Sequence, residues 1–91
     1  MDKIYYVYIL ECQDGSFYTG ISIDPEKRLK EHLGSNLGAK YTKAHKPIGI
    51  VYLEKCQGRS EASRREYEIK QMTKAIKIEL VESYKKSASK P

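Results

Sequence analysis

The chain has 91 residues, of which 40% are hydrophobic and 32% are charged, and its formal net charge is +5. This length fits one domain and excludes two, and the composition is that of a soluble globular domain and not of a disordered chain. The sequence has neither an apolar run near the ~20 residues of a transmembrane helix nor the apolar region of a secretory signal, so we expect a cytoplasmic protein. The positive charge favours a polyanionic partner, with nucleic acid as the first candidate.

Two strands joined by a tight turn are predicted at the start of the chain. Residues 4–11 (IYYVYILE) are rich in tyrosine, isoleucine and valine, which favour a pleated, half-buried strand. An Asp-Gly pair within residues 13–16 marks a turn, and residues 17–21 predict the second strand. Because side chains alternate along a strand, the even- and odd-numbered residues of the first strand should face opposite sides of the hairpin.

A helix is predicted over about residues 24–33. Asp24 can cap its N-terminus, and Gly34 suits the position just after its end. A stripe of leucines is expected to face the sheet. Arg28 and His32, which are four residues apart, should share the adjacent face of the helix.

A loop and a third strand follow this helix. Residues 34–47 (GSNLGAKYTKAHKP) are rich in glycine and lysine and predict a basic loop, and residues 48–56 (IGIVYLEKC) predict a strand. The two cysteines, Cys12 and Cys56, do not have the spacing of metal ligands. We expect both to be reduced and buried near strand ends.

Two helices are predicted in the last third of the chain. They cover about residues 60–72 and 74–84, with Ser60 and a threonine as their N-caps. The element order ββαβαα predicts an α+β domain over residues 1–84, in which helices flank a three-stranded, mainly antiparallel sheet. The remaining residues, 85–91, are expected to form a disordered tail.

Glu66 lies among apolar positions of the first of these helices, four residues after Ala62 and three before Ile69. An unpaired carboxylate on the buried side of a helix is strongly destabilising, so Glu66 should have a cationic partner. That partner is either a basic side chain, such as Arg28 or a nearby lysine, or a metal ion. From the spacing alone the ion pair is favoured.

Taken together, the polar and aromatic residues of the chain resemble those of the GIY-YIG nuclease family. The matching positions, in chain order, are Tyr6-Val7-Tyr8 and Tyr18-Thr19-Gly20 for the two halves of the name motif, then Arg28, His32 and Glu66. The loop before the third strand also resembles that of small stand-alone bacterial members of the family. The resemblance covers about residues 3–82 and implies the same α+β fold.

The resemblance implies metal-assisted hydrolysis of a DNA phosphodiester bond. Glu66 would bind Mg²⁺ or Mn²⁺, and Arg28 would grip the scissile phosphate. Tyr8 or Tyr18 would orient or deprotonate the attacking water, and His32 would share that role or hydrogen-bond a tyrosine hydroxyl. Larger enzymes of this type act in processes such as DNA repair and rely on an added module or a protein partner for target selection.

The basic loop adds candidate nucleic-acid contacts. Lys40, Lys43 and Lys46 would contact backbone phosphates, and Tyr41 would stack on a base. Because no recognition helix stands out, cutting should be structure-selective or non-specific, and RNA is compatible with the same features. The alternative is a non-catalytic nucleic-acid-binding module, since the chain has no asparagine after Glu66. A third interpretation is a protein-interaction subunit with surface tyrosines.

Overall fold

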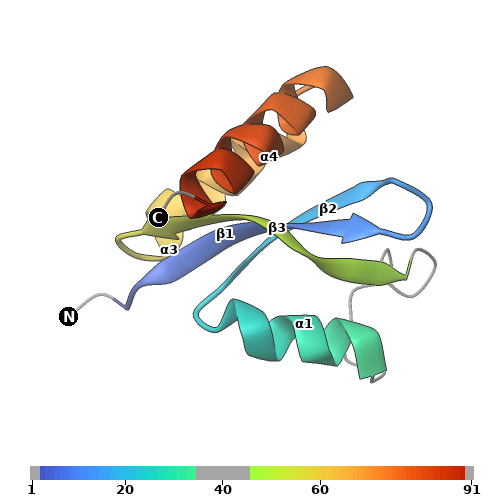
Figure 1. Cartoon of the computed structure of the whole chain (residues 1–91). Coiled ribbons are helices and arrows are strands. Elements are labelled where there is room, and N and C mark those ends of the chain that lie inside the picture. The colour runs from blue at the N-terminus through green and yellow to red at the C-terminus, as the bar shows by residue number, and fades with distance from the viewer. Residues whose placement is uncertain (1–2, 35–45, 90–91) are drawn as a thin grey trace.

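The computed structural model describes residues 3–34 and 46–89. Within these residues the sheet is antiparallel, and its strand order is β2-β1-β3. Figure 1 shows α1 on one face of the sheet and both α3 and α4 on the other. The predicted α+β class and element order are confirmed. The elements are β1 (Tyr5–Cys12), β2 (Phe17–Ser22), α1 (Pro25–Gly34), β3 (Pro47–Cys56), α3 (Arg59–Lys70) and α4 (Lys74–Ser89).

The hairpin of β1 and β2 forms as its sequence predicts. Gly15 adopts a φ of 83°, which glycine accepts without strain, and Asp14 Oδ1 accepts a hydrogen bond from the backbone N–H of Ser16 at 3.0 Å. The strands pair so that Tyr8 lies opposite Gly20. Central β1 is thereby hydrogen-bonded on both sides, and it gives the sheet its rigid middle.

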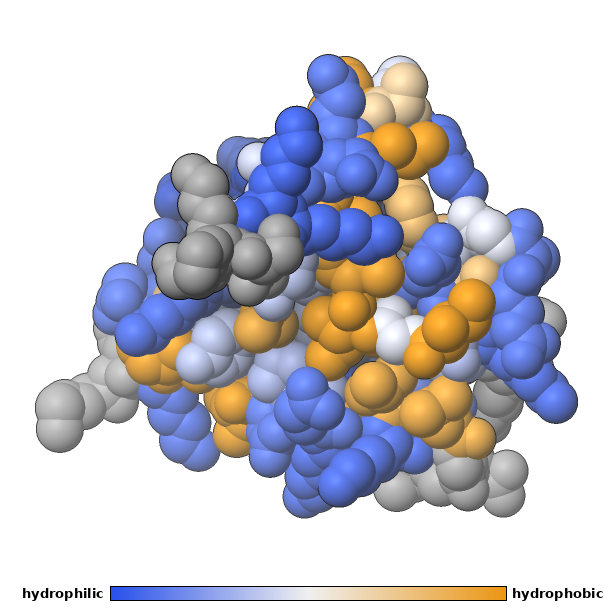
Figure 2. Space-filling view, viewed as in Figure 1, coloured by the Kyte–Doolittle hydropathy of each residue, from blue (hydrophilic) through white to orange (hydrophobic). Residues whose placement is uncertain are grey.

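The hydrophobic core lies between the sheet and the α3–α4 layer. Odd-numbered residues of β1 face this layer, whereas Tyr8 faces α1, which confirms the predicted alternation. Hydrophilic side chains cover α1 and α4 on the side seen in Figure 2, and hydrophobic side chains lie between them along the sheet. The fully or nearly fully buried members of the core are Val7, Ile9, Tyr52, Cys56, Ala62, Ile69 and Val81.

The two cysteines are free and buried, as predicted. Cys12 ends β1 and Cys56 ends β3. In the antiparallel pairing of these strands, Cys12 lies opposite Pro47 and Cys56 lies opposite Tyr5, so the two thiols sit at opposite ends of the sheet. Their role is to pack.

The helix caps agree with the sequence in two cases out of three. Asp24 Oδ1 accepts the N–H of Lys27 at 3.2 Å, and Thr73 caps α4 in the same way. Ser60, however, does not cap α3, because the helix begins one residue earlier after Gly58. Gly58 has a φ of 123°, which only glycine adopts readily, and this bend starts the helix at Arg59.

Helix α4 extends beyond its predicted end at residue 84. It runs to Ser89, so residues 85–89, which were expected to be disordered, are helical. The ring of Tyr84 packs edge-on against that of Tyr52, with 5.6 Å between centroids, and fixes the helix to the sheet. The chain has no glycine or proline between Lys74 and Lys90 to stop the helix sooner. Each of the described helices is too short or too polar to span a membrane.

Candidate active site

The phenol of Tyr8 is at the centre of the candidate site. Tyr8 lies in the middle of β1, its side chain is 1% exposed, and its strand partner on β2 is Gly20. A Cβ atom built on Gly20 would lie 2.6 Å from Oη of Tyr8. The ring therefore lies across β2 in space that only a glycine leaves open, and the hydroxyl reaches towards that edge of the sheet.

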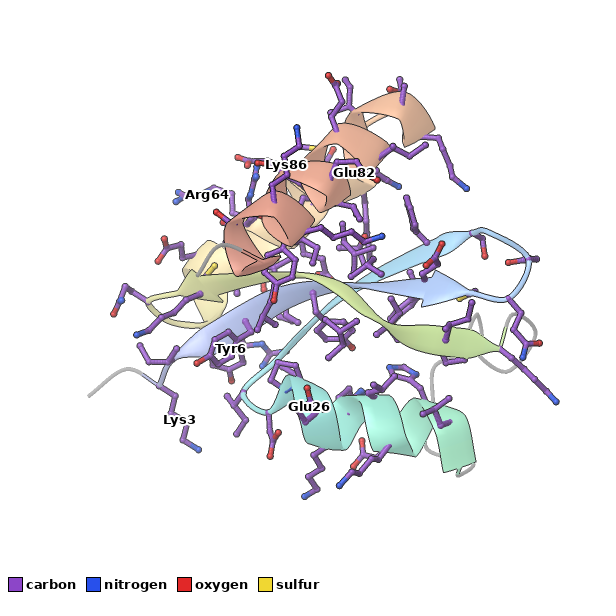
Figure 3. The ribbon with its side chains drawn as sticks, in the orientation of Figure 1. Lys3, Tyr6, Glu26, Arg64, Glu82 and Lys86 are labelled. Carbon is purple, nitrogen blue, oxygen red and sulfur yellow. The ribbon has the colours of Figure 1, made fainter. Side chains whose placement is uncertain are left out.

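Two rings, one from β2 and one from α1, pack together with this phenol. The ring centroid of Tyr18 lies 6.4 Å from that of Tyr8 and 5.3 Å from that of His32. Oη of Tyr8 and Nε2 of His32 are 3.4 Å apart, a long hydrogen bond. Figure 3 shows Tyr6, another even-numbered residue of β1, on the same side of the sheet as α1.

The side of α1 that faces the sheet differs from the prediction, and His32 shows the difference. The predicted leucine stripe would have turned Leu33 towards the sheet, but Leu33 is 56% exposed and His32 is 5% exposed. The helix is rotated so that the imidazole packs against the tyrosine rings. The His32 imidazole packs against the rings of Tyr8 and Tyr18 and lies near the Tyr8 hydroxyl. It therefore occupies the inward-facing position that was predicted for a leucine.

Arg28 lies one helical turn before His32. Its Nη1 donates to Oε1 of Glu31 at 2.8 Å, and about a third of its side chain (34%) is exposed. Glu31 was not among the predicted site residues, although its spacing of three residues from Arg28 on a helix was a signal for this ion pair. A pocket of about 300 Å³ adjoins this pair. It is lined by Ser22, Ile23, Asp24, Lys27, Arg28 and Glu31.

The surroundings shift the titration of both Tyr8 and His32. Burial, together with the negative charges of Tyr18 and Glu66, raises the pKa of Tyr8 to about 12, against the opposing effect of the Arg28 guanidinium. Burial and then the charge of Arg28 lower the pKa of His32. Tyr8 is therefore a neutral phenol at neutral pH, and the surroundings of His32 favour its uncharged imidazole form.

Glu66 lies on α3, which packs on the other face of the sheet from α1. Helix α3 contacts both β1 and β2, and the Glu66 charge is among those that act on Tyr8. Oε2 of Glu66 is 3.2 Å from Nζ of Lys70, and 24% of the Glu66 side chain is exposed. The expected pairing with a basic residue is thus observed, with Lys70 and not Arg28 as the partner.

The donor set limits the kind of metal ion that would fit. Within residues 3–34 and 46–89, His, Cys, Asp and Glu side chains do not form a group of three or more that could enclose a metal ion. A lone, partly exposed carboxylate such as that of Glu66 fits a hard cation that retains most of its water, as Mg²⁺ does. It does not fit a zinc site, which needs three or four protein ligands.

The predicted loop contacts fall largely outside the described residues. Lys40, Tyr41 and Lys43 belong to that segment, so their role stays a prediction. Lys46 is exposed, and its carbonyl oxygen accepts the N–H of Gln13 at 2.8 Å. This bond ties the start of β3 to the β1–β2 turn.

Comparisons with known proteins agree with this architecture. Residues 4–79 match the family model described as the GIY-YIG catalytic domain. A UPF0213 protein of Desulfotalea psychrophila is 46% identical over 85 residues, which is 93% of this chain and 77% of that protein. A UPF0213 protein of Staphylococcus saprophyticus is 48% identical over 81 residues, which is 89% of this chain and 96% of that protein.

Two solved structures share the fold. The solution NMR structure of a UPF0213 protein from Bacillus halodurans has a TM-score of 0.55 and 44% identity, covering 87% of this chain and 83% of that one. An E. faecalis protein solved by the same method has a TM-score of 0.61 and 42% identity, covering 91% and 88% of the two chains. With a family model matched over most of its length and close relatives on the same fold, the chain belongs to the GIY-YIG nuclease superfamily, with bacterial UPF0213 proteins among its relatives.

Proposed function

We propose that this protein is a divalent-metal-dependent endonuclease that hydrolyses DNA phosphodiester bonds in a structure-selective or non-specific manner. One observation carries the proposal: the charges of Arg28 and Glu66, which come from helices on opposite faces of the sheet, both act on the pKa of the Tyr8 phenol. A cation, a carboxylate and a phenol are the groups that such hydrolysis needs.

Arg28 and Glu66 would bind opposite parts of the reacting phosphate. The planar guanidinium of Arg28 has donors enough to hold a phosphate oxygen while Glu31 fixes its position. Glu66 would hold Mg²⁺ or Mn²⁺, with Lys70 competing for the same carboxylate oxygen. When bound, the cation would neutralise charge on the phosphate and on the leaving 3′-oxygen.

The raised pKa of Tyr8 favours a proton relay over a free tyrosinate. With a pKa of about 12, Tyr8 is almost wholly protonated at neutral pH. As the water oxygen bonds to phosphorus and the bond to the 3′-oxygen breaks, Tyr8 would take the proton of the water and pass its own to Nε2 of His32. Tyr18, which is less buried than Tyr8, would orient the water.

A nicking assay on supercoiled plasmid and on branched DNA, with Mg²⁺ or Mn²⁺, tests the proposal. We expect nicking by the native protein and a fall in the nicking rate of about 10²-fold or more in Glu66→Gln and Arg28→Ala. Each variant lacks a charged side chain that would stabilise the transition state. Arg28→Lys should recover only part of the activity, since an ammonium group lacks the planar fork.

Matched controls separate these effects from general loss of charge. Glu82→Gln removes an exposed carboxylate on α4 (Figure 3), and Lys30→Gln removes an exposed cation on α1, and both should nick normally. Nicking that survives in Glu66→Gln and Arg28→Ala would place the chemistry elsewhere. DNA binding without product under either metal would support the non-catalytic module instead.

A further inference from the structure

Tyr67 is an aromatic side chain that α3 leaves in solvent. It is 66% exposed and follows directly after Glu66. It contributes nothing to the core cluster, which α3 enters through Ala62 and Ile69. A tyrosine ring has a large apolar surface and a π-face, so a flat partner that stacks on it would remove that surface from water.

Basic side chains flank Tyr67 on the exposed side of α3. Arg64 and Lys70 lie three residues before and after it, which places them one turn away on the same side of the helix. Arg64 is exposed and points away from the sheet in Figure 3, and 49% of the Lys70 side chain is exposed. Lys70 also contacts Glu66, so this surface is continuous with the candidate active site.

The acidic residues of α3 other than Glu66 are paired with groups outside the set Arg64, Tyr67 and Lys70. Glu68 pairs with Arg65 at 3.1 Å, and Arg65 in turn donates to Glu54 of β3 at 3.0 Å. Glu61 accepts the N–H of Gln57 at 2.7 Å, at the end of β3. Both carboxylates are thus engaged with Arg65 or with the backbone at the end of β3, and the exposed residues nearest Glu66 on α3 include the Tyr67 ring and the Lys70 cation.

We infer that Arg64, Tyr67 and Lys70 form a binding surface for an unpaired DNA segment that leads to the active site. Tyr67 stacks on a base, and the two cations contact the phosphates on either side of it. Base stacking on an aromatic residue requires a base that is free of its duplex, whereas cations alone bind duplex and single strand alike. The inference rests on the proposed function and names its substrate class, which is DNA with unpaired nucleotides beside the cut.

Fluorescence anisotropy of a labelled single-stranded oligonucleotide in EDTA measures this binding without cleavage. Tyr67→Ala should weaken single-strand binding about tenfold, the lower part of the range for one stacked base. Tyr67→Phe and Tyr67→Trp should bind within about twofold of the native protein, whereas Tyr67→Leu, which is apolar but lacks a π-face, should bind as weakly as Tyr67→Ala. Arg64→Gln should reduce the salt dependence of log Kd by about 0.7.

Controls on α4 remove similar groups from a different helix. Ile78→Ala removes an apolar side chain that is 43% exposed, and Lys85→Gln removes an exposed cation, and both should leave affinity unchanged. An equal loss of duplex and single-strand binding in Tyr67→Ala would overturn the stacking role. Unchanged binding in Tyr67→Ala, no single-strand binding by the native protein, or tighter binding of the matching RNA would also overturn the inference.

Comparison with Glu66→Gln separates this inference from the proposed function. Glu66→Gln should lose cleavage and keep single-strand binding, whereas Tyr67→Ala should raise KM for branched DNA and keep kcat. A native protein that binds through Tyr67 but never cuts would contradict the endonuclease and leave the binding surface standing. If the native protein and Tyr67→Ala both cut DNA with the same KM and kcat, the binding surface would be contradicted and the endonuclease would stand.

Discussion

The hydroxyl of Tyr8 occupies the space that a side chain at position 20 would need, and Gly20 leaves that space open. A Cβ atom on Gly20 would lie 2.6 Å from Oη and 2.8 Å from Cζ of Tyr8, well inside any ordinary contact. The Tyr8 ring is buried among its neighbours and has little freedom to retreat. The position of the phenol at the edge of β2 therefore depends on the missing side chain at Gly20.

Gly20→Ala should displace Tyr8 and impair both stability and activity. We expect the free energy of unfolding to fall by about 1–3 kcal/mol, as for overpacking in other cores, and nicking to fall with it. Gly49→Ala is the matched control, because a Cβ there meets nothing within 4 Å, and it should change stability by less than about 0.5 kcal/mol. Denaturant titration and the plasmid assay measure the two effects, and equal stability of both variants would contradict the prediction.

The stability contributed by His32 should depend on pH. Burial and the charge of Arg28 lower the pKa of His32 in the folded protein, so the unfolded chain binds a proton more readily. The folded state should therefore lose stability as the pH falls below about 6.5, the ordinary pKa of histidine, and keep it above that value. Denaturant titration at pH 7.5 and 5.5 should show a smaller drop in His32→Gln than in the native protein, and parallel drops would refute this origin.

Thr19→Val should stabilise the protein. The Thr19 side chain is 4% exposed, and its Oγ1 has no hydrogen-bond partner among the described residues. Valine has almost the same shape without the unpaired hydroxyl, so we expect a gain of about 1 kcal/mol.

Thr73→Val also replaces a threonine by valine, but at a position where the threonine hydroxyl accepts a hydrogen bond. Thr73 Oγ1 accepts the N–H of Ile76 at 3.3 Å at the start of α4, so its loss should cost about 1 kcal/mol. Thermal or denaturant unfolding compares the two variants. A loss of stability in Thr19→Val as large as in Thr73→Val would mean that the Thr19 hydroxyl is satisfied.

Ile69→Ala should be among the most destabilising truncations on α3. Ile69 is fully buried between α3 and the sheet, and its truncation leaves a cavity that costs about 2–5 kcal/mol. Ile76, on α4, is 45% exposed, so Ile76→Ala should cost less than about 0.5 kcal/mol. Equal midpoints of urea unfolding for the two variants would contradict the position of the core.

The sequence predicts the fold well where neighbours along the chain decide it. Alternation in β1, the Asp14-Gly15 turn and the caps at Asp24 and Thr73 each depend on residues within a few positions of one another. The end of α4 was placed too early at residue 84, although the lack of glycine or proline up to Lys90 was a local signal for a longer helix.

The candidate site divides in the same way. Residue types and intervals were enough to select Tyr8, Arg28 and Glu66 from the sequence alone, because they follow a family pattern. Whether those groups lie near one another depends on packing across the sheet, between segments as far apart as β1 and α3. Which side of α1 turns inward, and hence the burial of His32, was decided by the shapes of the two tyrosine rings. Chain order determined the elements and the chemical groups, and side-chain packing between distant elements decided their orientation, since no local pattern records the space that Gly20 leaves open.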